Sequence, residues 1–153
     1  MIAGVELQLG HVFQTADIAW PVSLAYTYSQ AEESRDDSQS GVLEGDELAS
    51  VPGNTMSLRM GAQVGARWDS YAVVKYTDSM CVNVSCNRDE SRFAETEGFV
   101  VIDLGSRYAF TEALSAFVKL ENAFDERAIV SRQPDGARPN KPRTAMIGIE
   151  WVF

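Results

Sequence analysis

The sequence has no long hydrophobic run, although 45% of its 153 residues are hydrophobic. No segment approaches the roughly eighteen uninterrupted apolar residues that a membrane-spanning helix needs. The chain also opens with Met1-Ile-Ala-Gly-Val, which lacks the charged start, apolar stretch and small-residue cleavage site of a signal peptide. A spanning helix is therefore not predicted, and the apolar residues must follow another pattern.

Basic residues are scarce as well, since 13 Lys and Arg stand against 22 Asp and Glu and the net charge is −9. Nucleic acid is not a predicted partner, because binding to phosphates needs clustered Lys and Arg. The single histidine, His11, has no nucleophile context that would complete a catalytic triad. Asp17, Asp69 and Glu112 lack the paired-carboxylate pattern of glycoside chemistry. The sequence thus predicts no enzyme activity and no catalytic residue.

Only two cysteines are present, Cys81 and Cys86, and both lie in a polar stretch. Two thiolates without histidine make a poor zinc site. A small loop-closing disulfide in an oxidising compartment fits better, with two free thiols as the alternative. The acids between Ala31 and Pro52 do not follow the EF-hand spacing, so a solvated loop is favoured over a calcium site. No metal and no cofactor are predicted.

The last ten residues show the pattern that the apolar residues do follow. Ala145, Ile147, Ile149, Trp151 and Phe153 alternate with Met146, Gly148, Glu150 and Val152. A period of two with one apolar side indicates a β-strand. Soluble domains rarely end on an aromatic strand, whereas outer-membrane β-barrels turn an apolar side to lipid and place aromatic girdles at both interfaces. An edge strand on a soluble core is the alternative.

The same alternation predicts about seven strands, joined by connections that are alternately short and long. The segments are 5–13, 20–29, 56–64, 68–76, 100–110, 114–121 and 144–153. Bacterial outer-membrane barrels have short periplasmic turns and long outer loops, and they close with an even number of strands. We therefore predict an all-β, antiparallel transmembrane β-barrel, of which residues 1–153 supply about seven C-terminal strands. A soluble β-sandwich binding module and a passive or structural barrel, such as part of a porin or adhesin, are the alternatives.

Several stretches together are similar to one known family. They are Phe99-Val-Val-Ile-Asp-Leu-Gly-Ser-Arg-Tyr-Ala-Phe, Leu120-Glu-Asn-Ala-Phe-Asp-Glu, Gly136-Ala-Arg-Pro-Asn-Lys-Pro-Arg-Thr and the terminal Trp-Val-Phe. Ala25-Tyr-Thr-Tyr, Gly45-Asp-Glu-Leu and Val51-Pro also follow the family's pattern. The chain resembles the C-terminal end of a TonB-dependent outer-membrane receptor of the ferric-citrate or siderophore type. The likeness is most specific from Phe99 onward.

This resemblance implies a barrel of about twenty-two strands that takes up a scarce ligand, most often a ferric chelate, with energy delivered through TonB. It also implies an outer-membrane location, contact with membrane lipid, and a plug domain inside the barrel that this sequence lacks. The closing strand resembles the signal that the barrel assembly machinery reads. Gly148, Trp151 and Phe153 match its pattern, and Met146 departs from it.

Two groups of charged residues are candidates for binding. Arg132, Arg138, Lys141 and Arg143 form a basic cluster in the third long loop, 125–143, of an otherwise acidic chain. Because Arg binds carboxylates through two hydrogen bonds, we expect this cluster to help capture an anionic iron chelate. Contacts with lipopolysaccharide phosphates, with the acidic loops or with water are the alternatives. On the strands, Arg59, Asp103, Arg107, Lys119 and Glu121 are predicted to contact the plug or to pair with one another.

Overall fold

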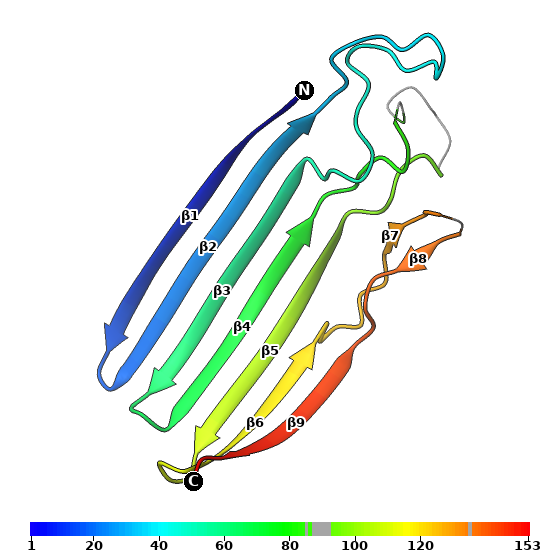
Figure 1. Ribbon diagram of the computed structural model, residues 1–153. Helices are drawn as coiled ribbons and strands as arrows, with labels where there is room; N and C mark the ends of the chain where they lie inside the picture. Colours follow the sequence, from blue (N-terminus) through cyan, green and yellow to red (C-terminus); the bar gives the residue numbers. More distant parts are fainter. Residues whose placement is uncertain (85, 87–92, 135) are drawn as a thin grey trace.

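The structure, a computed structural model, describes residues 1–84, 86, 93–134 and 136–153. Within these ranges no helix is long and apolar enough to cross a membrane. Seven strands form one antiparallel sheet in the order β1-β2-β3-β4-β5-β6-β9 (Figure 1). Their bounds are Ile2–Thr15 (β1), Ile18–Ala31 (β2), Asn54–Val64 (β3), Trp68–Thr77 (β4), Phe99–Ala109 (β5), Leu114–Glu121 (β6) and Thr144–Trp151 (β9). The predicted all-β, antiparallel fold is confirmed.

The third long loop contains two further short strands that the alternation does not reveal. Strand β7 is Ile129–Ser131 and strand β8 is Arg138–Pro139, and they pair as a hairpin outside the main sheet (Figure 1). Strands of three and two residues are too short to show a period of two. Pro139 is tolerated there because β8 lies at an edge, where a strand need not donate every backbone hydrogen bond.

All three short connections lie at one end of the sheet and the long loops lie at the other (Figure 1). Thr15 pairs with Ile18, so only Ala16 and Asp17 separate β1 from β2. Ala16 has a φ of 51°, the left-handed conformation that a two-residue hairpin turn requires. The alternation of loop lengths in the sequence therefore becomes a separation in space, with the short turns at one end of the sheet and the long loops at the other.

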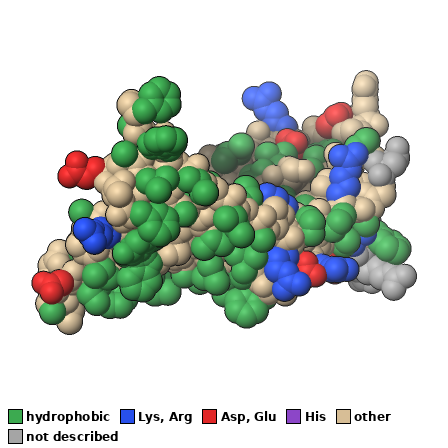
Figure 2. Space-filling model, turned by 90° about the horizontal axis from the view of Figure 1, so that it is seen from below, with side chains coloured by type: hydrophobic (Ala, Val, Ile, Leu, Met, Phe, Trp, Pro, Cys, Tyr) green, Lys and Arg blue, Asp and Glu red, His purple; other side chains and the backbone are tan. Residues whose placement is uncertain are grey.

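One side of the sheet, called here the apolar face, presents aliphatic and aromatic residues in rows across the strands. One such row, with each residue opposite the next, is Leu9, Leu24, Leu58, Val74 and Ile102. No other described part of the chain covers this face: Ile147 and Ile149 on β9 are 83% and 76% exposed. Hydrophobic side chains dominate much of the surface in Figure 2. A β-sandwich would bury such residues against a second sheet, so the single open sheet excludes that alternative.

The opposite side, called here the polar face, carries small, polar and charged residues. It includes Gln8, Ser23, Ser57, Lys75, Asp103, Lys119 and Glu150. Strands β1 and β9 each leave one edge unpaired within the sheet, which is therefore not closed. An open antiparallel sheet with one apolar and one polar face is the arrangement expected of a segment of barrel wall.

Two glycines on the polar face receive aromatic rings from the neighbouring strand. Tyr71 lies opposite Gly105, and a Cβ atom added to Gly105 would be 2.4 Å from the Tyr71 ring. Phe117 lies opposite Gly148 in the same way, again at 2.4 Å. The Arg59 guanidinium carbon stacks 4.0 Å from the centre of the Tyr71 ring. Each glycine therefore provides space for a ring, which fixes the position of that ring on the wall.

The contact between Tyr71 and Gly105 leads to a prediction about assembly. Gly105→Val should lower the amount of correctly assembled protein, because overpacking of this kind costs about 1–3 kcal/mol. The measurement is the fraction of membrane-extracted protein with heat-modifiable migration. Tyr71→Ala combined with Gly105→Val should restore much of that fraction. An equal loss in the single and the double variant would show that the ring is not the cause.

Candidate functional site

Ion pairs connect most of the charged side chains on the polar face. Lys75 Nζ lies 2.7 Å from Asp103 Oδ2, Arg107 Nη2 lies 3.1 Å from Glu150 Oε2, and Lys119 Nζ lies 2.5 Å from Glu121 Oε1. Four of the five strand residues predicted to pair or to contact a plug are therefore paired, although Lys75 and Glu150 were not among the expected partners. Arg59 stacks on an aromatic ring instead. Contact with a plug domain stays a prediction.

Asn122 ties the third long loop to the end of β6. Its side chain is buried, and its φ of 49° turns the chain away from the strand. The Asn122 Nδ2 atom donates to the carbonyl oxygens of Glu126 and Lys141, each at 2.9 Å, and its Oδ1 accepts the Glu126 N–H. The Asn122 N–H donates to Asp103 Oδ1 at 2.9 Å. Asn tolerates the left-handed conformation better than most residues. Asn122 can therefore turn the backbone at the end of β6 and also form the side-chain hydrogen bonds to Glu126 and Lys141.

Asp125, three residues further on, holds the far end of the same loop. Its Oδ1 accepts the N–H of Arg143 at 3.2 Å, and its Oδ2 accepts a hydrogen bond from the Arg127 guanidinium at 3.1 Å. These two contacts, the Arg143 N–H first, hold the pKa of the Asp125 carboxyl below its usual value. Asp125 therefore stays ionised at neutral pH, and its charge is matched by Arg127.

The four predicted cations of the loop fall into two pairs. Arg138 lies in β8 opposite Ser131, which immediately precedes Arg132, so these two arginines belong to the hairpin. Lys141 and Arg143 lie at the base of the loop, where Asn122 holds the Lys141 carbonyl and Asp125 holds the Arg143 N–H. Both pairs lie at the end of the sheet that carries the long loops, called here the outer end. Lys141 and Arg143 are at the base of the third loop, and Arg132 and Arg138 are in the hairpin.

The surroundings of the four cations differ. Arg132 Nε donates to the Glu95 carbonyl oxygen at 3.0 Å, and its guanidinium lies 5.4 Å from the centre of the Phe93 ring. Lys141 Nζ donates to Glu121 Oε2. Among the described residues, the guanidinium groups of Arg138 and Arg143 have no hydrogen-bond or ion-pair partner. Arg132 therefore supports the loops, and binding of a ligand by the cluster stays a prediction.

The three long loops are joined to one another. The Glu97 N–H donates to the Ile129 carbonyl at 2.9 Å, and Ile129 N–H donates to Glu97 Oε2 at 2.7 Å, so the second loop holds the base of the hairpin. The Ser50 N–H donates to the Cys81 carbonyl at 2.9 Å, which joins the first loop to the second. The outer end of the sheet is therefore one connected structure.

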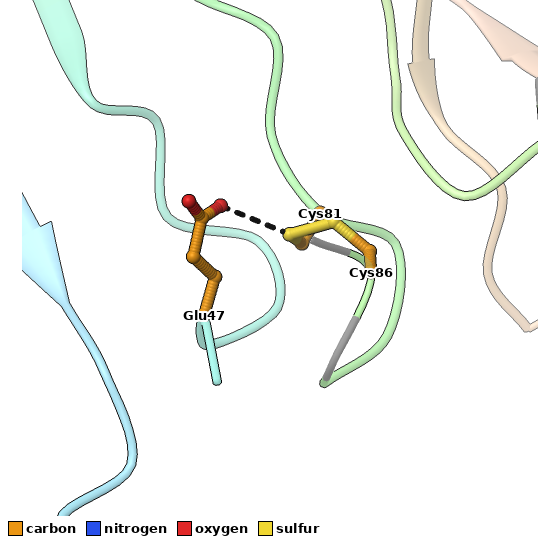
Figure 3. Close-up of side chains that lie close together, drawn as sticks. All are labelled: Glu47, Cys81 and Cys86. Carbon is orange, nitrogen blue, oxygen red and sulfur yellow. Dashed lines mark hydrogen bonds between the residues drawn. A yellow bond between two sulfur atoms is a disulfide. The ribbon is translucent and has the colours of Figure 1, made fainter. Parts of the chain in front are cut away.

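Cys81 and Cys86 form a disulfide, which confirms the favoured prediction for this pair. Both cysteines are buried, and Cys81 Sγ lies 3.2 Å from Glu47 Oε2 of the first loop (Figure 3). These three side chains are close enough to surround a metal ion. Because each sulfur is bonded to the other, neither is a thiolate ligand, and the group connects the first and second loops.

A cavity of about 480 Å³ lies at the outer end of the polar face. It is lined by Lys75, Phe99, Val101, Asp103, Glu121, Asn122, Val130, Asn140 and Lys141. Lys141 is the member of the predicted cluster that reaches it. The lining combines two lysines, two carboxylates and two amides with three apolar side chains, so polar groups converge on one space that also has apolar walls.

Sequence reasoning missed Lys75 and Asn140 as parts of this site. In the sequence, Lys75 is one polar residue among others in an alternating strand. Nothing in the sequence of β4 indicates that the third loop lies beside Lys75. Asn122 belongs to the Asn-Ala-Phe-Asp-Glu stretch, but its bonds to Glu126 and Lys141 depend on how the loop returns.

The three residues of the predicted assembly signal do not share one face. Gly148 lies on the polar face beneath Phe117, while Trp151 is 72% exposed on the apolar face. Phe153 follows the end of β9 and is fully exposed. Recognition of these residues by the barrel assembly machinery stays a prediction, and Gly148 has a packing role of its own.

The strands and the site define an outer-membrane type of barrel wall, and the comparison with protein families identifies which one. A family model described as "TonB dependent receptor-like, beta-barrel" matches residues 1–123. The chain therefore belongs to the TonB-dependent receptor family. No curated protein matches the sequence.

Solved structures of receptors share the fold. The siderophore receptor PiuA from Acinetobacter baumannii matches with a TM-score of 0.77 and 20% identity over 98% of this chain and 21% of that one. The ferric-catecholate import receptor Fiu from E. coli K12 matches with a TM-score of 0.74 and 23% identity over 99% and 21%. The ferripyoverdine receptor of the outer membrane of Pseudomonas aeruginosa gives 0.70 and 23% over 98% and 19%. The chain thus spans about a fifth of the length of these receptors.

Family and neighbours are transport receptors and not enzymes, in agreement with the sequence analysis. Their cargo differs, however, because a copper transporter, OprC, also matches, with a TM-score of 0.68 and 18% identity over 99% of this chain and 23% of that one. At these identities the likeness concerns the fold alone, so the cargo has to be argued from the side chains of this chain.

The bonds of Asn122 lead to a prediction about the third loop. Asn122→Asp should loosen the base of the loop, because a carboxylate cannot donate to the Lys141 and Glu126 carbonyls. The Glu126 carbonyl keeps the Asn140 Nδ2 donor, so the main loss is the bond to Lys141, and one such hydrogen bond contributes about 0.5–1.5 kcal/mol. Trypsin cleavage of the loop on intact cells should become faster. Asn83→Asp is the matched control, because it makes the same change at an exposed site with no amide hydrogen bond among the described residues. Equal cleavage rates in both variants would contradict this role.

Proposed function

We propose that the chain forms the C-terminal strands of an outer-membrane receptor that binds a ferric chelate and passes it inward with energy from TonB. In this proposal residues 1–153 are part of the barrel domain, and the plug domain belongs to another part of the same protein. The apolar face meets membrane lipid and the polar face lines the interior. The barrel assembly machinery inserts the protein, and Gly148, Trp151 and Phe153 are the residues we expect it to read.

The basic third loop is the observation that carries the choice of an anionic ligand. The chain has a net charge of −9, yet four cations gather between Arg132 and Arg143 at the outer end of the polar face. The guanidinium groups of Arg138 and Arg143 form no hydrogen bond or ion pair with a described residue, and Arg143 interacts with Asp125 only at longer range. Guanidinium groups bind carboxylates through paired hydrogen bonds. An anionic ferric chelate supplies such groups.

Membership of the receptor family favours this proposal over a passive or structural barrel. Siderophore, ferric-catecholate and ferripyoverdine receptors among the neighbours support an iron chelate as the cargo. The orientation follows from the loops, because long loops lie outside in bacterial barrels and all the long loops of this sheet share one end.

The experiment replaces Arg138 and Arg143 with Ala in the receptor that carries this chain. Affinity for ferric citrate or for a ferric tris-catecholate, both anionic, should fall roughly threefold to tenfold, because each exposed charge pair contributes about 0.2–1 kcal/mol. Equilibrium binding to the purified receptor and uptake of radioactive iron by cells measure the effect.

Arg67→Ala is the matched control, since it removes the same charge at the opposite end of the sheet, in the short connection before β4. It should leave both measurements unchanged. If the double Arg variant binds both chelates as tightly as the parent protein, the assignment of an anionic ligand to this loop is wrong.

A further inference from the structure

Glu121, which lines the cavity, pairs with two lysines, of which Lys141 also lines the cavity. Its Oε1 atom lies 2.5 Å from Lys119 Nζ, and its Oε2 atom accepts a hydrogen bond from Lys141 Nζ. The Glu121 side chain is 18% exposed, whereas those of Lys119 and Lys141 are 37% and 61% exposed. A single carboxylate thus uses both of its oxygens on cations that are more accessible than the carboxylate itself.

The charges around Glu121 do not balance. Lys75, Lys119 and Lys141 face only Asp103 and Glu121, so the five side chains together carry one excess positive charge. Asp103 is fully engaged, because its Oδ1 accepts the Asn122 N–H and its Oδ2 accepts Lys75. The excess therefore lies with the two lysines that share Glu121.

These lysines are able to exchange partners. A lysine ammonium sits on a flexible four-carbon stem and is not restricted to one geometry, as an arginine in a paired contact would be. Lys141 lines the cavity, and Lys119 on the wall pairs with Glu121, which also lines it, so an anion that enters the cavity competes with Glu121 for both lysines. The amides of Asn122 and Asn140 and the apolar groups of Phe99, Val101 and Val130 complete the lining.

We propose that this cavity is a binding subsite for a carboxylate-bearing anionic ligand, and that Glu121 is its built-in competitor, which an incoming carboxylate displaces from Lys141 and Lys119. This inference rests on the proposed function, since the ligand would be part of the imported chelate. Glu121 is then a specificity-determining residue: it neutralises the lysines before binding, and only a ligand that brings its own negative charge gains the two lysines by displacing it.

Removal of the Glu121 carboxylate should improve the binding of an anionic ligand. Glu121→Gln keeps the shape of the side chain and removes its charge, so both lysines become available to the ligand. Affinity for citrate and for ferric citrate should rise about threefold to tenfold, as expected when two partly exposed ion pairs no longer have to be broken. The dependence of binding on salt concentration should become steeper.

The test uses the purified, detergent-solubilised receptor and calorimetric titration with citrate at up to millimolar concentration. Glu126→Gln is the matched control, because it removes the same charge five residues further along the chain, in the third loop, and the Glu126 contacts to Asn122 involve only its backbone. It should change affinity less than Glu121→Gln does. Glu121→Gln combined with Lys141→Gln should lose the gain, and a neutral ferric trihydroxamate should bind equally to the parent protein and to Glu121→Gln.

Two results would overturn the subsite: no binding of citrate by the parent protein, or unchanged or weaker binding in Glu121→Gln with heat-modifiable migration retained. A merely structural Glu121 would give the second result, since its loss would then loosen the loop without favouring an anion. Failure of the proposed function is distinguishable, because the Arg138 and Arg143 variant measures chelate capture at the loop and does not involve Glu121.

Discussion

Pairing of the backbone in a sheet with two unlike faces is the constraint on which the rest of this structure depends. Within an apolar medium every N–H and C=O group needs a protein partner, and only helices or closed sheets of strands meet that demand. The seven strands meet it between neighbours, from Thr15 with Ile18 to Leu114 with Trp151, and leave one edge each of β1 and β9 to be paired by further strands of a closed sheet. Because the side-chain period is two, the same pairing that satisfies the backbone places the apolar residues of neighbouring strands on one face.

The polar face can then hold charges that a dry core would not tolerate. Lys75, Asp103, Lys119 and Glu121 lie on strands whose other side is aliphatic, and each charge has a partner. Asn122 and Asp125 extend this network into the third loop by binding backbone groups of Lys141 and Arg143. Hydrogen bonds from the end of β6 and the start of the loop thus fix the backbone positions of Lys141 and Arg143. The Glu97–Ile129 hydrogen bonds connect the second loop to it, and the Ser50–Cys81 hydrogen bond connects the first loop to the second.

Much of the fold was predictable because its signals are local. Alternation such as Leu9, Leu7 and Val5 against Gln8 and Glu6 specifies a strand and its two faces without knowledge of any partner. Loop lengths specify which strands are joined by tight turns. The candidate site was predictable only in part. The four cations of the third loop were predicted from the sequence. The contacts that hold Arg132, and the cavity that Lys75 and Lys141 line together, were not, because they involve residues far apart in the sequence.

The sequence by itself determined the class of structure, the number of strands in the main sheet, their faces and the charge of the third loop, and it favoured the pairing of Cys81 with Cys86. Only the tertiary structure decided the β7–β8 hairpin, the seating of Phe117 over Gly148, and the sharing of Glu121 by Lys119 and Lys141. The physical reason is the range of each interaction. Side-chain periodicity arises within a few residues of one strand, whereas a hydrogen bond or an ion pair acts over a few ångströms between groups that the chain brings together only when the sheet has formed.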